Sequence, residues 1–287
     1  MNSDFIFVNV AKQEVAMNFL NITVERDKED SSVVVVSINR PRKLNAISVA
    51  TLTELRTLFG EVLLKDISTV RVVVVTGSGP KAFSAGLDLS DECVSAVFGP
   101  TSLQPGSRAA ELKRLIDCMQ LPILAIAEFP RPVIAAVNGL CIGLGVDLIS
   151  ACDIRVCSSS VQLAVREIKI GICADLGSLF FLPRICQSES WVREICYTGR
   201  IFGAAEALAN GLVSSVAEDA LTRGLEIARE IARGPPVAVE GIKVSLNQSA
   251  RDRMRENFSA VSVWNSARLQ ETDTIQECVA AVMKSKL

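Results

Sequence analysis

Residues 133–153 of this 287-residue chain read VIAAVNGLCIGLGVDLISACD, and this stretch indicates the class of fold. The apolar run over 133–137 predicts a buried strand, and the Asn-Gly pair that follows it predicts a turn. Gly143 and Gly145 then flank the start of a helix that extends to about Cys152. A strand that passes through a short turn into a helix is the unit of α/β folds with mainly parallel strands.

The same alternation recurs along the rest of the chain. Strands are predicted over 33–38, 70–75, 154–157 and 161–165, and amphipathic helices over 52–63 and 108–129, the second with Pro122 as a kink or register break. After about residue 200 the strand signal fades and helical periodicity continues. We therefore expect an N-terminal extension over 1–18, an α/β core over 19–205 and an all-helical region over 206–287.

The composition excludes several classes of function. The formal net charge is −2 and no basic tract or face stands out, so nucleic-acid binding is not expected. The uncharged stretch that could be considered as a membrane span, 132–146, is too short and too rich in glycine to cross a bilayer. The nine cysteines form no C-x-x-C pair and sit mostly in apolar runs. That favours buried thiols in a reducing compartment over disulfides or a zinc site, so no metal is expected.

The chain contains no histidine. Every mechanism built on imidazole is thereby excluded, including Ser-His-Asp and Cys-His hydrolases and histidine-ligated metals. A general acid or base must be Asp, Glu, Lys, Cys or the single tyrosine, Tyr197.

The sequence printed here ends in Ser285-Lys286-Leu287, which has the form of a peroxisomal targeting tripeptide. We expect an import receptor to bind it and the protein to reside in peroxisomes, or in glycosomes where these exist. The alternative is a chance ending to a helix, but a match at this position is rare by chance.

Two glycine-rich turns are candidates for binding an oxyanion. Residues 83–89 (FSAGLDL) follow one predicted strand, and residues 138–147 (NGLCIGLGVD) follow another. Helix N-termini offer unpaired N–H groups and the positive end of the helix dipole, so two such turns facing each other could hold the enolate oxygen of a thioester. Each turn alone is weak evidence, and neither matches a P-loop or a dinucleotide fingerprint.

Three carboxylates cluster after the second turn, at Asp147, Glu167 and Asp175. Each has a structural interpretation: Asp147 lies in a first helical turn, Glu167 is flanked by cations and could form a surface ion pair, and Asp175 could be an N-cap. The surrounding apolar, glycine-rich sequence makes carboxylates costly unless they serve a function.

Several motifs in order resemble the crotonase (enoyl-CoA hydratase/isomerase) superfamily over roughly residues 20–215. They are Asn39-Arg40-Pro41 with Asn45-Ala46, the two turns above, Cys152-Asp153-Ile154-Arg155, Thr198-Gly199-Arg200 with Ala204, Glu206 and Ala207, and Gly211-Leu212-Val213. The resemblance implies a spiral of ββα units, a C-terminal helical region that trimerises, and often a hexamer. It also implies acyl-CoA thioester substrates.

The resemblance assigns the oxyanion donors to the backbone N–H groups of Leu87 and Leu144. Leu144 departs from the glycine usual in the family, and its side chain could narrow the pocket. By the same resemblance the CoA ester is expected against the two turns, at Ser84, Ala85, Gly86, Leu87, Asp88, Leu89 and Gly143.

Within the superfamily, the acids resemble those of Δ3,5-Δ2,4-dienoyl-CoA isomerases. Their reaction removes a proton at C2 and adds one at C6, which needs one basic and one protonated carboxyl group, and an apolar pocket keeps a carboxyl neutral by raising its pKa. The resemblance makes Glu167 the C2 base, Asp175 the C6 acid and Asp147 an auxiliary acid, although the first two roles could be exchanged. No cofactor is implied, because CoA is part of the substrate and the shift is redox neutral.

Two alternatives remain open. One is another crotonase activity, enoyl-CoA hydratase or Δ3-Δ2-enoyl-CoA isomerase, although hydratases use two glutamates where this chain has Asp147 and Glu167. The other is a non-catalytic acyl-CoA-binding scaffold, which Leu144 in the oxyanion turn would support.

Overall fold

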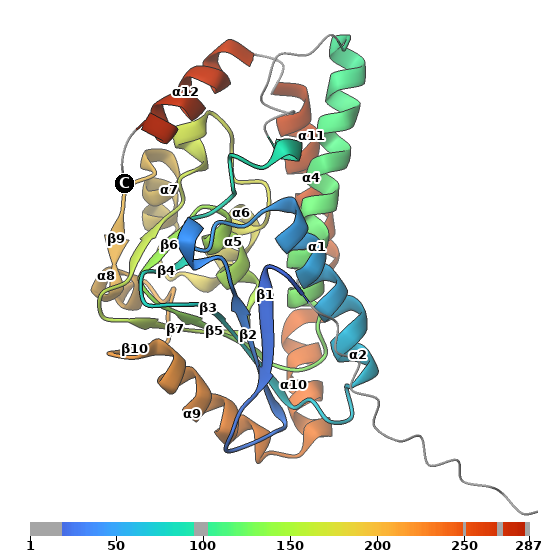
Figure 1. Ribbon diagram of the computed structural model, residues 1–287, viewed down its shortest axis with the longest axis vertical. Coiled ribbons are helices and arrows are strands. Elements are labelled where there is room, and N and C mark those ends of the chain that lie inside the picture. The colour runs from blue at the N-terminus through green and yellow to red at the C-terminus, as the bar shows by residue number, and fades with distance from the viewer. Residues whose placement is uncertain (1–18, 95–102, 249–250, 269–271, 285–287) are drawn as a thin grey trace, which may run out of the picture.

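A six-stranded sheet forms the centre of the computed structural model, which describes residues 19–94, 103–248, 251–268 and 272–284 (Figure 1). Its order is β1-β2-β3-β5-β7-β10. The first pair is antiparallel and every other neighbouring pair is parallel. The strands are β1 (Ile22–Arg26), β2 (Val33–Ile38), β3 (Val72–Gly77), β5 (Val133–Val137), β7 (Ile154–Ser158) and β10 (Ser215–Ala217).

A second, smaller sheet is formed by strands that follow those of the large sheet along the chain. It has the order β4-β6-β8-β9, made of β4 (Ala82–Ser84), β6 (Leu140–Ile142), β8 (Gln162–Ala164) and β9 (Phe202–Gly203). Strands β3, β5 and β7 each lead through a short turn into β4, β6 and β8, so the two-strand unit is repeated three times. At Gly139 this turn requires glycine, because φ is +56° and a Cβ atom would lie 2.2 Å from the Lys81 carbonyl oxygen.

Helices surround the sheets. They are η1 (Pro41–Lys43), α1 (Val49–Thr57), η2 (Leu58–Val62), α2 (Leu63–Lys65), α4 (Pro105–Ala127), α5 (Leu144–Ala151), η3 (Glu167–Ile170), α6 (Ser178–Ile185), α7 (Glu189–Thr198), α8 (Ala204–Ala209), α9 (Ala220–Ala232), α10 (Pro236–Gln248), α11 (Arg251–Arg268) and α12 (Thr272–Lys284). The main core lies between one face of the large sheet and helices α1, α4 and α5.

The opposite face of the large sheet is covered by α9, below the sheet in Figure 1. Ala220, Ala228 and Ala232 are buried against valines and alanines of the strands. Gly224 lets the helix approach closely, since a Cβ atom there would lie 3.2 Å from the Cβ of Ala136. Small residues on this helix face therefore determine how closely it packs.

The expected α/β class with C-terminal helices is confirmed, and the strands predicted over 33–38 and 133–137 have these bounds in the structure. Helix α4 continues through Pro122 without a break. One detail of the expected all-helical region, 206–287, is wrong: β10 lies within it and pairs with β7. Three residues of intermediate burial are too short a strand to give a detectable period.

Residues 1–18 and 285–287 lie outside the described residues, so the structure does not bear on the expected extension or on the C-terminal tripeptide. In the described part of the chain, no helix has the length and apolar character needed to cross a membrane.

Candidate active site

An apolar cavity brings the predicted site residues together. It is enclosed by the loop after β4, helix α4, the start of α5, the segment from η3 to residue 176, and Val282 of α12. Its volume is about 120 Å³, roughly eight times what one water molecule needs, so it has room for part of a ligand. The apolar wall includes Leu112, Ile116, Met119, Ile170 and Leu176.

The two glycine-rich turns meet at one side of this cavity. Gly86 has φ +94°, and a Cβ atom on it would lie 2.9 Å from the Ile142 carbonyl oxygen and 3.8 Å from the Leu144 nitrogen. The hydrogen bonds of the described residues use neither the N–H of Leu87 nor that of Leu144, and both residues line the cavity. Two residues that line the same cavity therefore each have a backbone N–H group without an acceptor among the described residues.

The two donors arise from different local structures. Leu144 is the first residue of α5, so its N–H has no acceptor within the helix. Leu87 was expected at a helix start as well, but it forms an isolated bridge with Ile47, and the next helical residue is Glu92. Its N–H is free because the bridge uses the flanking groups, the Gly86 carbonyl and the Asp88 N–H.

The Leu144 side chain is only 2% exposed and belongs to the main hydrophobic core, although the residue also borders the cavity. Because most of the side chain is packed among core residues, the leucine adds to the stability of α5 while its backbone N–H remains at the cavity.

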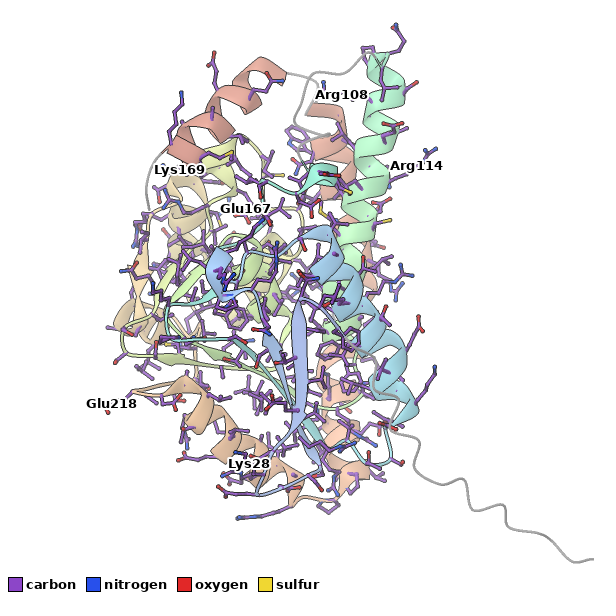
Figure 2. All side chains as sticks on the ribbon, in the orientation of Figure 1. Lys28, Arg108, Arg114, Glu167, Lys169 and Glu218 are labelled. Carbon is purple, nitrogen blue, oxygen red and sulfur yellow. The ribbon has the colours of Figure 1, made fainter. Side chains whose placement is uncertain are left out.

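Asp147 and Glu167 lie close to Gly143 and Leu144 in the second glycine-rich turn. Asp147, in the first turn of α5, accepts a hydrogen bond of 2.6 Å at Oδ1 from the Ser178 N–H, and so caps α6 as well. Glu167 begins η3, and its Oε1 would be 3.1 Å from a Cβ atom at Gly143. Figure 2 shows Glu167 in the interior and Lys169 at the edge beside α12.

Glu167 is buried, and among the described residues it forms no ion pair; its Oε2 has no hydrogen-bond partner. A surface ion pair therefore does not account for this residue. An unpartnered buried carboxylate oxygen is costly unless it binds a ligand or carries a proton.

Asp175 also lines the cavity, and its carboxyl group is held by the C-terminal region. Asn265 of α11 donates from Nδ2 to Asp175 Oδ2 at 2.5 Å. Gln120 of α4 donates to the Asp175 carbonyl oxygen at 2.7 Å. The N-cap interpretation of Asp175 is wrong, because α6 begins at Ser178 and Asp147 accepts its N–H.

Burial raises the pKa of all three carboxyl groups. The pKa of Asp175 rises to about 7, against the opposing hydrogen bond from Asn265. The pKa of Glu167 is raised well above its ordinary value, first by burial and then by the neighbouring Asp147. Desolvation raises the pKa of Asp147 as well, although hydrogen bonds from Ser178 oppose it. The cluster therefore holds protons near neutral pH, which ordinary surface carboxyls do not.

Of the residues expected to contact the CoA ester, five line the cavity, namely Ala85, Gly86, Leu87, Leu89 and Gly143. Ser84 and Asp88 are not among the lining residues. The Ser84 hydroxyl accepts the Gly86 N–H at 3.1 Å, and Asp88 forms ion pairs with Arg40 and Lys43 at 2.8 and 3.0 Å. Their contacts indicate that they shape the turn.

Sequence reasoning gave neither Asn265 nor Gln120 a role at the site, although Trp264-Asn265 resembles the C-terminal region of the same isomerase subfamily. A signal for Asn265 exists, because α11 buries Ser262, Asn265 and Ser266 at helical spacing where an apolar stripe is usual. Polar side chains on the buried face of a helix must have partners inside the protein. Gln120 gives no comparable signal, since it stands alone in the apolar stripe of α4.

The family model for enoyl-CoA hydratase/isomerase matches residues 28–286. The chain belongs to this family, as the motifs indicated. It is similar to the mitochondrial Delta(3,5)-Delta(2,4)-dienoyl-CoA isomerase of Rattus norvegicus, with 40% identity over 255 residues, 88% of this chain and 77% of the relative. The peroxisomal Delta(3,5)-Delta(2,4)-dienoyl-CoA isomerase of Arabidopsis thaliana is 36% identical over 272 residues, 94% of this chain and 96% of the relative.

The fold is shared with solved structures of the family. The crystal structure of an enoyl-CoA hydratase/isomerase from Pseudoalteromonas atlantica superposes with a TM-score of 0.77 at 26% identity. The match covers 93% of this chain and 98% of that one.

Proposed function

We propose that the protein isomerises 3,5-dienoyl-CoA to 2,4-dienoyl-CoA by moving a proton from C2 to C6. The observation that carries this proposal is the set of three buried carboxyl groups on one apolar cavity, beside two free backbone donors. Two of these groups, Glu167 and Asp175, are held by different elements. The names of the rat and Arabidopsis relatives support the same activity.

The position of each acid favours one assignment of roles. The thioester carbonyl would accept hydrogen bonds from the N–H groups of Leu87 and Leu144, which stabilise the enolate that forms when C2 loses its proton. C2 is bonded to that carbonyl, so the base must lie beside the Leu144 N–H, where Glu167 Oε1 would be 3.1 Å from a Cβ atom at Gly143. C6 lies four bonds further along the chain, and Asp175, held from α11, is the candidate acid.

The chemistry requires one ionised and one neutral carboxyl group at the same time. Because the pKa values of all three acids are raised, the cluster carries fewer than three negative charges near neutral pH, and its protons are shared among coupled sites. The proposed roles place a proton on Asp175 and an anion on Glu167, with Asp147 as the auxiliary acid. Burial and the charges of Asp147 and Asp175 raise the pKa of Glu167, and a proton on Asp175 removes one of these opposing charges. The shift is redox neutral, so we propose that neither a metal nor a redox cofactor takes part.

Turnover and proton exchange, both measured in heavy water, test the function and the roles of the acids together. The wild type should convert 3,5-dienoyl-CoA to the more extended conjugated product, followed by absorbance, and should not hydrate 2-enoyl-CoA. Asp175→Asn should lose isomerisation by orders of magnitude yet still exchange the C2 protons with solvent, whereas Glu167→Gln should lose both. The reverse pattern would exchange the roles, and hydration without isomerisation would overturn the proposal.

We also propose that the protein forms trimers, or hexamers made of two trimers. The support is a set of exposed apolar side chains on α10, including Val237 at 84% and Leu246 at 74% exposure, which would be covered in an assembly. Sedimentation of the purified chain tests this, and a monomer at micromolar concentration would contradict it.

For localisation we propose the peroxisome, or the glycosome where one exists, with an import receptor binding Ser285-Lys286-Leu287. The tripeptide and the peroxisomal Arabidopsis relative support this, whereas the rat relative is named mitochondrial. A fluorescent protein fused to the N-terminus should enter peroxisomes, and removing the three residues should leave it outside. Mitochondrial import of both forms would overturn the proposal.

A further inference from the structure

The Asn265 side chain is fixed at both ends of its amide. Its Nδ2 donates to the Cys173 carbonyl oxygen at 3.0 Å and to Asp175 Oδ2 at 2.5 Å, and its Oδ1 accepts from the Cys173 thiol at 3.1 Å. A carbonyl oxygen only accepts hydrogen bonds, so the NH₂ end must face Cys173 and Asp175. The residue is 2% exposed, which excludes competing water.

This arrangement distinguishes the two oxygens of Asp175. An NH₂ group has no lone pair to accept a proton, so Asp175 Oδ2 must be the acceptor in its bond with Asn265. When Asp175 is neutral, Oδ1 therefore carries its proton. Resting on the proposed function, we infer that Asn265 is a positioning residue that fixes Oδ1 as the oxygen that delivers the proton to C6.

The hydrogen bond has a measurable electrostatic consequence. It favours the ionised form of Asp175 and opposes burial, so its loss should raise the pKa of this acid. The other titratable groups around Asp175 are Asp147 on α5, Glu167 on η3 and Cys173 on the same loop. Arg166 and Lys169 line the same cavity, and from α4 the neutral Gln120 donates to the Asp175 carbonyl oxygen. Replacing Asn265 by leucine also removes the acceptor of the Cys173 thiol, which stays neutral because burial raises its pKa to about 12. Among the described residues, none of the other charged groups named here bonds to Asn265.

Gln120 provides a matched control. Like Asn265, it joins the Asp175 segment to α11, but it donates to main-chain carbonyls, at 2.7 Å to Asp175 and 3.0 Å to Phe258. It does not touch the carboxyl group. Asn265→Leu and Gln120→Leu therefore both loosen the docking of α11, while the first alone removes the donor to the Asp175 carboxyl group.

The experiment is the pH dependence of kcat for the wild type, Asn265→Leu and Gln120→Leu. With Asp175 as the acid, Asn265→Leu should move the alkaline limb up by about one pH unit or more and lower kcat about tenfold or more at neutral pH. Gln120→Leu should lose stability without moving that limb. Asn265→Gln keeps the donor but displaces it by one methylene, so it should lower kcat with the limb in place.

Two results would overturn the inference. One is an Asn265→Leu enzyme with an unmoved limb and kcat within about threefold of wild type. The second result applies if Asn265→Leu does not fold: an Asn265→Gln enzyme with the same kcat as the wild type.

A readout that needs no turnover separates this inference from the proposed function. The carboxyl of Asp175 is titrated by infrared difference spectroscopy in the free protein, and is identified by its loss in Asp175→Asn. Asn265→Leu should raise its pKa whether or not the wild type isomerises 3,5-dienoyl-CoA. An inactive wild type with this rise removes the proposed function, and with it proton delivery to C6, but keeps the control of the Asp175 carboxyl by Asn265. An active wild type with no rise removes the inference alone.

Discussion

Replacing Gly86 by alanine should separate the two turns that we propose as the oxyanion site. At φ +94° an alanine is strained by about 1–3 kcal/mol. Its Cβ would also lie 2.9 Å from the Ile142 carbonyl oxygen, which is main chain and cannot move without moving the Leu144 N–H. Overpacking of this kind costs about 1–3 kcal/mol more, so Gly86→Ala should lower the free energy of unfolding by at least about 2 kcal/mol.

The effect on activity should exceed the effect on stability. A displaced Leu144 N–H removes one of two donors to the enolate, and loss of one such donor costs about 10²–10³ in kcat. The loss should appear in kcat with 3,5-dienoyl-CoA, since the enolate forms only along the reaction path. Activity is measured per folded molecule, with folding checked by circular dichroism.

Gly60→Ala is the matched control, because Gly60 lies exposed on η2 with nothing within 4 Å of a Cβ atom. It should keep full activity and gain about 0.5–1 kcal/mol of stability. If folded Gly86→Ala keeps kcat within about threefold of Gly60→Ala, the turns do not form the oxyanion site.

Three further results are expected. Burial raises the pKa of Asp175 from 3.8 in the unfolded chain to about 7 in the folded protein. Between these pH values the folded protein holds a proton that the unfolded chain releases, so the free energy of unfolding falls as the pH rises towards 7. Asp175→Asn should therefore gain up to about 4 kcal/mol over wild type between about pH 4 and pH 8 in urea unfolding; a pH-independent difference would contradict the raised pKa. Leu144→Ala should cost about 2–5 kcal/mol of stability yet keep turnover, because the backbone donor remains; unchanged unfolding would show that the side chain is not core. Asp88 has a pKa held below its ordinary value by hydrogen bonds from Ser90, Arg40 and Lys43, although burial opposes the shift, so its pairs stabilise the fold above about pH 4 and fail in acid. Asp88→Asn should lose about 1–3 kcal/mol at neutral pH, with the difference from wild type shrinking in more acidic urea titrations.

Much of the fold could be predicted because its signals are local. The valine runs of β2 and β3 and the strand, turn and helix over 133–153 are contiguous in the chain. Both faces of β3 and β5 are buried, and β2 is buried on one face and half-buried on part of the other. The cluster of Asp147, Glu167 and Asp175 was also within reach, because carboxylates in apolar sequence are conspicuous.

The parts that could not be predicted depend on contacts between distant segments. Asn265 meets Asp175 across 90 positions of sequence, and no local period indicates the partner. The free N–H of Leu87 results from its bridge to Ile47, a pairing that propensity does not reveal. Contacts of this kind, between segments far apart in the sequence, are determined by the packed fold rather than by the neighbouring residues.

The most direct test of the central claim is a single turnover with 3,5-dienoyl-CoA that carries two deuterium atoms at C2, in ordinary water and with the protein in excess. If Glu167 removes the C2 deuteron and Asp175 supplies the proton at C6, the product holds one deuterium and mass spectrometry shows the loss of the other. A product that retains both deuterium atoms, one of them now at C6, would mean that a single carboxyl carries the proton across. That result would contradict the two-acid account.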